Sequence, residues 1–554
     1  MNLRMAGPEL VGRRPRSPGF VYTALATLMM VFVVGLAYTT RQPPPPSIAE
    51  YAPQAVEQIS QAPDEQSSEF GEGGSGIEGG ATPELGQVQE PPPPPIDVPR
   101  VRKCIGEPQR QTEDPQSPPC VPYFDGNNGG STSKGVTRNE ITVAFPNDNF
   151  FIDNRAIADM VIYFNSRYEF YGRKLFLADY PPRGGFAAVP DPPQMFADAV
   201  RVDEEIKAFA SIGYPARWGA EYHYYDELAR RGIVSVAHRT GLVSEDHYRE
   251  QAPYEWHYLP SVDLMLRNYG EFVCNLLAGK SPAFGGPEVS LRAVRKFGLI
   301  YQRTQDGSVP DISLLVNAMK GCGATPVVVE DSQKDTTANR QTAIVTLSSQ
   351  QVTSVICWCE LGDTRNIFMA AATNQGFYPE WLVSTYIDQD LDNAFNLSNP
   401  DQGANVIGVS FRNKLLRKFE MPWYWAVKEV DSNYEPADGS YYHLGARYSS
   451  LLLLASAIQT AGPKLTPATL AQGLAKTRFP NPSPGEAPYY QGRVGFEGGR
   501  HTMMSDGVMF WYSLSQPGTI DPSTPGRVCY VLGGKRFGLG SWPKLDAPFK
   551  EECS

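Results

Sequence analysis

From about residue 135 onward, the apolar positions of the chain repeat at two different spacings. Short apolar runs typical of buried strands occur at 141–145, 174–177, 208–212 and 233–237. Between these runs, apolar side chains recur at steps of three and four residues, which predicts helices at about 157–164, 195–206 and 220–230. Asp153 or Asn154 is placed to cap the first of these helices. The alternation predicts right-handed βαβ units and parallel sheets.

A second series of the same kind follows. Its expected strands lie at 297–301, 327–329 and 352–358, and its expected helices at about 312–321 and 337–347. Two separate series indicate two α/β lobes rather than one wide sheet. Further on, an apolar helix is expected at 444–460, a helix beginning at Thr466-Pro467, and strands at 494–496 and 508–514.

The beginning of the chain has a different pattern. Arginines in residues 1–19 precede an uncharged apolar stretch at 20–38, which as a helix is long enough to cross a bilayer. Basic residues favour the cytoplasmic side. The sequence therefore predicts a cytoplasmic N-terminus at 1–19, a transmembrane signal anchor at 20–38 and an extracytoplasmic remainder, in a single-pass protein of the cell membrane. Cleavage of this segment as a signal peptide, giving a secreted protein, is the alternative.

The next segment, 39–103, is predicted to be a disordered linker. It holds proline runs at 43–46 and 91–95, and the stretch between them at 47–90 is acidic without a single lysine or arginine. Such a composition buries too little apolar surface to fold. The globular part is expected to cover 104–545, followed by a short tail at 546–554.

Charge and cysteine content narrow the possible partners and the compartment. A net charge of −11 argues against nucleic acid as a partner. The eight cysteines of an exported chain are expected to be paired. Two local pairs are expected to close, Cys104 with Cys120 and Cys529 with Cys553, and a third expected pair is Cys274 with Cys322. The Cys357-Trp358-Cys359 segment lacks the spacing of a zinc knuckle, so no metal site is predicted.

Signatures of catalysis are missing from the sequence. It contains no HExxH and no GxSxG motif. Gly279-Lys280-Ser281 resembles the end of a phosphate-binding loop, but Cys274 stands where that loop requires glycine. We therefore expect the chain not to be an enzyme and expect no cofactor.

Several segments in a fixed order carry a resemblance to a known family. They are 136–143, 164–167 with 171–175, 448–461, 465–475 and 492–496. This order resembles the type I periplasmic-binding-protein family, particularly the leucine-binding-like, branched-chain amino-acid substrate-binding proteins of actinobacterial ABC transporters. The resemblance implies a two-lobed α/β fold with parallel sheets flanked by helices and a hinged interlobe cleft. Lobe one would comprise about 136–260 and 391–497, and lobe two about 262–390 and 498–545.

The same resemblance implies a function. The chain would be an extracytoplasmic solute-binding protein that captures a small molecule between the lobes, with an ABC permease as its membrane partner. The alternative is a membrane-tethered ligand-sensing or scaffold domain of the same fold without a role in transport.

Candidate ligand-binding residues follow from the positions of the predicted strands, because parallel sheets bind ligands at the carboxyl ends of their strands. They are Tyr214, Trp218, His238, Arg239 and Thr240 in lobe one, and Asp306, Glu360 and Asp388 in lobe two. Aromatic faces together with both signs of charge favour an amino-acid-like or an aromatic, carboxylated ligand. Only Thr240 matches the small hydroxyl residues with which the family holds aliphatic amino acids.

Overall fold

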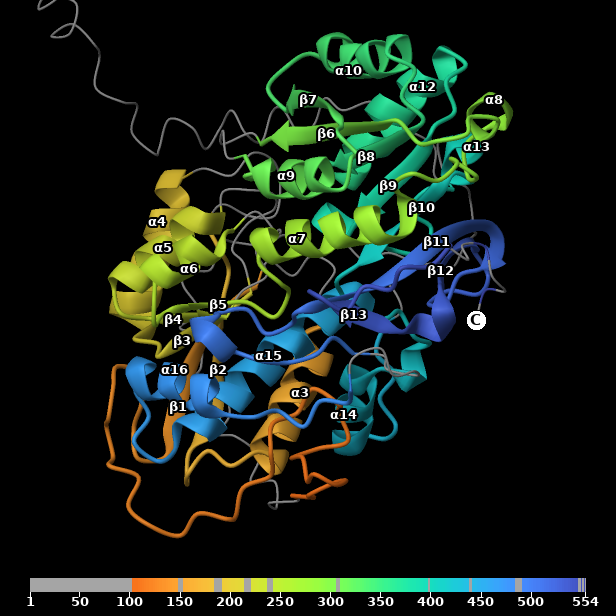
Figure 1. Cartoon of the computed structure of the whole chain (residues 1–554). Helices are drawn as coiled ribbons and strands as arrows, with labels where there is room; N and C mark the ends of the chain where they lie inside the picture. Colours follow the sequence, from red (N-terminus) through yellow and green to blue (C-terminus); the bar gives the residue numbers. More distant parts are fainter. Residues whose placement is uncertain are drawn as a thin grey trace, which may run out of the picture. The chain divides into compact units, whose positions relative to one another are not determined.

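A computed structural model describes residues 102–147, 153–183, 192–213, 221–236, 243–304, 309–396, 399–437, 441–483 and 491–546, with residues 550 and 553. These residues belong to one compact unit, Pro92–Ser554 (Figure 1). The expected anchor at 20–38 lies outside the described residues, and so does nearly all of the expected linker. No helix in the described part is both long enough and apolar enough to cross a membrane.

The first sheet is entirely parallel, with the strand order β2-β1-β3-β4-β5. Its strands are β1 (Glu140–Pro146), β2 (Lys174–Tyr180), β3 (Ala210–Ile212), β4 (Val234–Val236) and β5 (Glu255–Trp256). Its connecting helices are α3 (Asn154–Arg167), α4 (Pro192–Arg201) with η1 (Val202–Ile206), α5 (Glu221–Arg230) and α6 (Glu245–Glu250). Asp153 caps α3, because its side chain accepts a hydrogen bond from the backbone N–H of Ala156 at 3.0 Å.

The second sheet has the order β12-β11-β10-β9-β8-β6-β7, with β13 paired to β11. Its parallel strands are β6 (Phe297–Arg303), β7 (Val327–Ser332), β8 (Ser354–Trp358), β9 (Glu380–Ser384) and β10 (Val406–Ser410). The antiparallel strands are β11 (Asp506–Pro517), β12 (Pro525–Tyr530) and β13 (Arg536–Gly538). Its helices are α7 (Val262–Phe272) with η2 (Val273–Leu277), α8 (Pro287–Ser290), α9 (Ser313–Gly321), α10 (Thr337–Ser349), α11 (Leu361–Asp363), η3 (Thr364–Met369), α12 (Ala370–Asn374), η4 (Tyr386–Asp388) and α13 (Pro400–Gly403).

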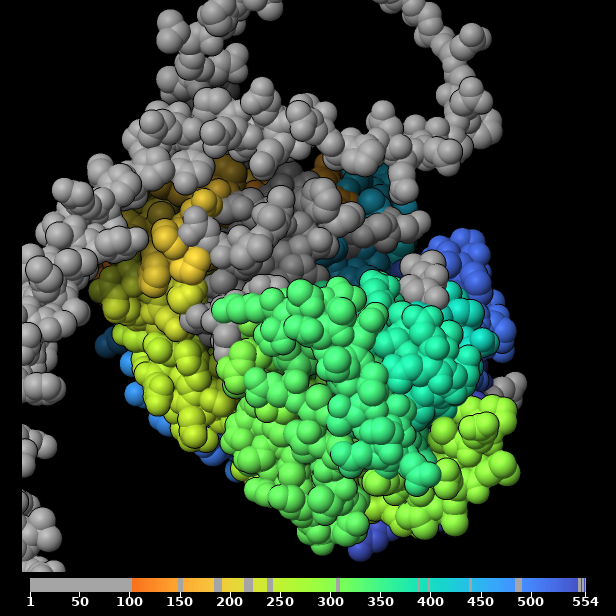
Figure 2. All heavy atoms as spheres, turned by 90° about the horizontal axis from the view of Figure 1, so that it is seen from above, coloured from red at the N-terminus to blue at the C-terminus, as the bar shows by residue number. Residues whose placement is uncertain are grey.

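Two sheets of this kind make the two-lobed α/β fold that the sequence predicts. All residues of β8, β9 and β10 are buried, as is typical of parallel strands covered on both faces. Figure 2 looks onto the second lobe, where the residues coloured green, which include β7 and α10, form a continuous surface.

The expected boundary of lobe one at residue 391 is wrong. β10 pairs with β9 and β11 and therefore belongs to the second sheet. Gly408 lets β10 approach β9 closely, since an added Cβ would lie 2.1 Å from the carbonyl oxygen of Val383. Only after β10 does the chain return to the first lobe, where α14 (Pro422–Val430) and α15 (Tyr441–Ala461) pack on α3 and α16 (Pro467–Lys476) packs on α15.

Three segments carry the chain between the sheets, and hydrogen bonds hold them side by side. The first contains His257, the second Asn413, and the third runs from Gly492 to Met503. In the first and third segments, His257 N–H donates to the carbonyl of His501 at 3.0 Å and Met503 N–H donates to the carbonyl of His257 at 2.8 Å. The second segment joins the third, since the backbone N–H of Gly492 donates to Asn413 Oδ1 at 2.8 Å. The lobes are thus connected by three adjacent crossings.

All eight cysteines form disulfides. Cys104–Cys120, Cys274–Cys322 and Cys529–Cys553 are the pairs expected from the sequence. The fourth bond, Cys357–Cys359, joins residues only two positions apart at the end of β8 and was not anticipated.

Candidate ligand-binding site

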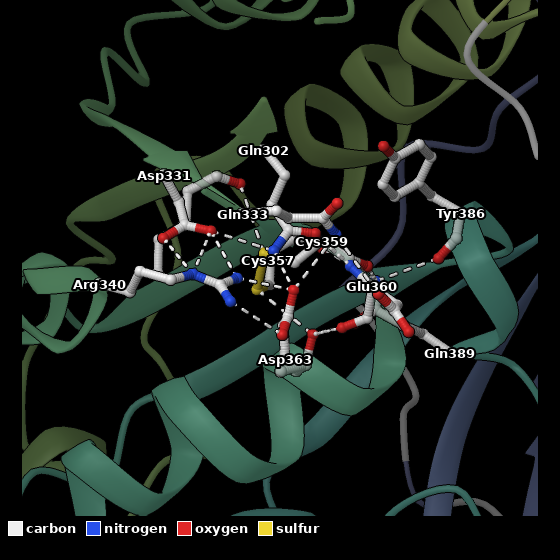
Figure 3. The surroundings of a disulfide bond; sticks show 12 residues. Gln302, Asp331, Gln333, Arg340, Cys357, Cys359, Glu360, Asp363, Tyr386 and Gln389 are labelled. Carbon is white, nitrogen blue, oxygen red and sulfur yellow. Dashed lines mark hydrogen bonds and ion pairs between the residues drawn. A yellow bond between two sulfur atoms is a disulfide. The ribbon is translucent and has the colours of Figure 1, made fainter. Parts of the chain in front are cut away.

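Polar side chains collect at the carboxyl edge of the second sheet (Figure 3). Because β6, β7, β8 and β9 are parallel, their carboxyl ends meet at this edge, which is where such sheets bind ligands. The side chains are Gln302, Asp331, Gln333, Glu360, Asp363 and Gln389, with Arg340 from α10.

Arg340 holds two carboxylates together at this edge (Figure 3). Its guanidinium lies 2.8 Å from Asp331 and 2.6 Å from Asp363. Only 7% of the Arg340 side chain and 1% of the Asp331 side chain are exposed. Burial opposes the charge of Arg340, but the hydrogen bonds to both carboxylates outweigh it and raise the pKa of the guanidinium. One cation thus serves two carboxylates, and the cluster fixes α10 and α11 to the end of the sheet.

Glu360, one of the predicted ligand residues, lies in the same network. Gln302 Nε2 donates to Asp363 at 2.6 Å, and Gln302 Oε1 accepts from the backbone N–H of Glu360 at 2.6 Å. The Glu360 carboxylate is half-buried and accepts a hydrogen bond from Gln333 at 3.3 Å. Glu360 is also the N-cap residue of α11. Glu360 follows β8 as expected, and its role in ligand binding stays a prediction.

The Cys357–Cys359 disulfide fixes the turn after β8. Gln389 Nε2 donates to the carbonyl oxygens of Cys357 and Cys359, at 3.0 and 2.8 Å. Between the two cysteines, Trp358 is fully buried and stacks on Tyr386 with ring centroids 5.5 Å apart. The Trp358 indole N–H has no hydrogen-bond partner among the described residues. The disulfide, the Gln389 side chain and the stacked rings of Trp358 and Tyr386 thus hold this turn in place.

Asp388, the other described candidate, is paired within the protein. It forms an ion pair with Arg412, whose Nε also donates to Asp390 at 2.9 Å. The second oxygen of Asp390 accepts hydrogen bonds from Thr385 and Ser410, at 2.7 and 2.6 Å. Burial works against the charge of Arg412, but the two carboxylates raise the pKa of its guanidinium. Through its ion pair with Arg412, Asp388 therefore also fixes the end of β10, where the chain leaves the second lobe.

The other predicted site residues stay predictions. Tyr214, Trp218, His238, Arg239, Thr240 and Asp306 lie outside the described residues. The strands that lead to the lobe-one residues end at Ile212 and Val236. Gly213, which follows β3, has a φ of +85°, and its carbonyl accepts a hydrogen bond from the Tyr225 hydroxyl at 3.0 Å. The described backbone thus fixes where the segment that contains Tyr214 and Trp218 begins.

A cation that we did not single out, Arg447, lies at the carboxyl end of the first sheet. It comes from α15, is 2% exposed, and has its guanidinium carbon 5.2 Å from the centre of the Phe145 ring. A Cβ added to Gly213 would lie only 2.8 Å from Arg447 Nη1. The available signal was the one arginine of α15, a helix without lysine, aspartate or glutamate, because a buried charge rarely persists without a structural or binding role.

The described surface also contains a hollow of about 600 Å³ between β6, β7 and α9. Tyr301 and Arg303 on β6 both donate to Glu330 on β7, at 2.7 and 2.8 Å. This hollow shares no residue with the network around Arg340, and its main polar groups pair with one another.

No protein-family model and no curated protein matches this sequence. Solved structures of low sequence identity do match. An ABC-transporter substrate-binding protein from Aeropyrum pernix is 12% identical, covering 72% of this chain and 96% of its own, with a TM-score of 0.48. A branched-chain amino-acid ABC transporter protein from Thermus thermophilus with bound valine is 13% identical, covering 73% and 97%, with a TM-score of 0.47.

A third structure of this kind is the substrate-binding protein from Desulfitobacterium hafniense in complex with Leu. It is 16% identical, covering 67% of this chain and 97% of its own, with a TM-score of 0.43. At these values the similarities identify no ligand for the present chain. The two-lobed fold is therefore inferred from the strand order of the two sheets, not from these similarities.

Proposed function

We propose that this chain is an extracytoplasmic solute-binding protein that captures a small molecule between its two lobes for an ABC importer. One observation carries the proposal: a parallel and a largely parallel α/β sheet are joined by three adjacent crossings, and polar side chains gather at the carboxyl edge of the second sheet. Such edges bind ligands. Adjacent crossings allow two lobes to close on a ligand as a hinge.

The disulfides support the proposed location. Four disulfides are typical of chains that fold in an oxidising compartment outside the cytoplasm. We propose that residues 20–38 anchor the chain in the membrane and that 39–103 act as a tether. A permease in the same membrane is the proposed partner. The chain is proposed to bind its solute without transforming it.

The proposed ligand is an amino-acid-like or an aromatic, carboxylated molecule. Trp218 and Arg239 would hold its ring and its carboxylate in lobe one, because an indole stacks on rings and a guanidinium binds carboxylates with two hydrogen bonds. In lobe two, the half-buried carboxylate of Glu360 would accept hydrogen bonds from a ligand ammonium group.

Native mass spectrometry of the full chain, purified in detergent, tests the proposal by detecting a co-purified small molecule. Calorimetry with that molecule then compares variants. Trp218→Ala and Arg239→Ala should each weaken binding at least about tenfold, or about 1.4 kcal/mol. Trp425→Ala and Arg417→Ala are the matched controls, since both residues are exposed, and these variants should bind like the wild type.

Two results would contradict the proposal. The first is unchanged affinity in both lobe-one variants, which would mean that the ligand does not bind at these strand ends. The second is unchanged cellular uptake of the identified molecule after deletion of the gene, which would separate binding from import.

A further inference from the structure

Three metal-ligating side chains converge in the first lobe, outside the residues considered so far. They are Asp226 of α5, His247 of α6 and Glu255 of β5, and one ligand atom from each lies within 4.8 Å of the others. His247 Nε2 is 3.2 Å from Asp226 Oδ1 and 3.3 Å from Glu255 Oε2. One imidazole nitrogen thus faces two carboxylates at nearly equal distances.

These separations fit a shared metal ion. A tetrahedral zinc with bonds of about 2.0–2.2 Å to nitrogen and oxygen keeps its donor atoms roughly 3.3–3.6 Å apart. The observed distance of 3.3 Å to Glu255 lies at the short end of this range, and the distance of 3.2 Å to Asp226 lies just below it. A protonated imidazole is the other arrangement with two carboxylates. Its single Nε2–H, however, points straight at only one acceptor.

The protein already holds the backbone of two of the three ligands, Glu255 and His247, in place. Glu255 pairs with Ser235 of β4 in the parallel sheet, and its backbone carbonyl lies 2.8 Å from His501 Nδ1. Ser244 caps α6 and accepts a hydrogen bond from the backbone N–H of His247 at 3.1 Å. Little rearrangement is therefore needed to bring the donor atoms around an ion.

The cluster lies between the interior and the solvent. The Glu255 side chain is 2% exposed and forms the buried side of the cluster. The Asp226 and His247 side chains are 34% and 27% exposed, so an ion can reach the cluster. Because each ligand comes from a different element, the sequence contains no metal motif at this place.

We propose that Asp226, His247 and Glu255 bind one divalent transition-metal ion, with zinc as the ion whose chemistry fits best. Zinc binds both imidazole nitrogen and carboxylate oxygen, the two kinds of donor atom that these residues supply. Three protein ligands leave a fourth position for water. The ion joins α5 and α6 to β5, which is the edge strand of the first sheet.

The full chain, stripped of metal with a chelator, is dialysed against zinc and its metal content is measured. We expect one zinc per chain and a higher melting temperature. His247→Ala and Asp226→Asn should each weaken zinc binding at least about tenfold. His223→Ala, a change on α5 outside the cluster, is the matched control and should bind zinc like the wild type. Cobalt in place of zinc should give visible absorption that His247→Ala abolishes.

Zinc binding by His247→Ala with wild-type affinity would overturn the proposal, as would a wild-type chain that binds no zinc. Because Glu255 is buried, Glu255→Gln is informative only where the variant folds. The variants at the partly exposed Asp226 and His247 therefore decide the outcome. None of these measurements involves solute capture, so this proposal and the proposed function can fail separately.

Discussion

Asp114 offers a direct test of how the segment before β1 docks on the first lobe. Its side chain is 2% exposed. The backbone N–H of Gln116 donates to one carboxylate oxygen at 2.8 Å, and the Tyr448 hydroxyl donates to the other at 2.9 Å. Burial raises the pKa of Asp114 from 3.8 to about 6, although these two hydrogen bonds partly oppose the shift.

The sign and size of the effect follow from this pKa. A carboxyl group with a higher pKa in the folded state binds protons more tightly there. Its contribution to stability is therefore complete below pH 4 and is lost as the pH rises through about 6. The difference between about 6 and 3.8, at 1.36 kcal/mol per pH unit, is about 3 kcal/mol.

Asp114→Asn keeps the shape of the side chain and removes its charge. We expect this variant to match the wild type near pH 4 and to exceed it by up to about 3 kcal/mol at pH 7.5. The free energy of unfolding is measured in urea on the disulfide-intact full chain at a series of pH values. Other groups titrate in both proteins, so their contribution cancels in the difference between the two unfolding free energies. Asp198 is one of them, because burial raises its pKa to about 6 as well.

Asp125→Asn is the matched control, because Asp125 is exposed in the same segment, and it should follow the pH dependence of the wild type. The reasoning would be refuted if Asp114→Asn and the wild type kept a constant difference in unfolding free energy from pH 4 to 7.5.

Three further predictions concern the edge of the second sheet, the disulfides and the membrane topology. Arg340→Ala leaves two carboxylates without their cation and should cost about 3–5 kcal/mol by calorimetry, whereas the same change at the exposed Arg417 should cost less than about 1 kcal/mol. Replacing Cys274 and Cys322 by serine opens a loop with a separation of 48 residues and should lower the unfolding free energy by about 4 kcal/mol, and a loss under about 1 kcal/mol would contradict the loop-closure argument. Protease added to intact cells should remove the globular part if residues 20–38 anchor it outside, and its survival beside a digested external control would exclude this topology.

Several strands were predictable because they are short apolar runs that become buried, whereas the run expected at 494–496 forms only an isolated bridge at Val494. The runs at 141–145 and 352–358 correspond to β1 and β8. The boundary at residue 391 came from the family resemblance rather than from an apolar run, and it places β10 in the wrong lobe. Its membership of the second sheet depends on the close approach of Gly408 to Val383, which is a contact between distant parts of the chain.

The candidate site was predictable only where a residue directly follows a strand. Glu360 could be found in this way because β8 ends two residues before it. The pairing of Arg340 with Asp331 could not be predicted. Arg340 lies on α10 and Asp331 on β7, and only the packing of the helix on the sheet brings the two side chains together. The Cys357–Cys359 bond was missed because a spacing of two has no characteristic pattern of its own.

The three crossings between the lobes have a consequence for the order in which the chain can fold. The first lobe requires α15, which ends at Ala461, and the second requires β11 and β12, which end at Tyr530. Neither hydrophobic core can therefore close while the nascent chain is still short. Contacts between such distant residues form slowly. For the export proposed above this delay would be useful, because both lobes would stay unfinished until most of the chain had emerged on the far side.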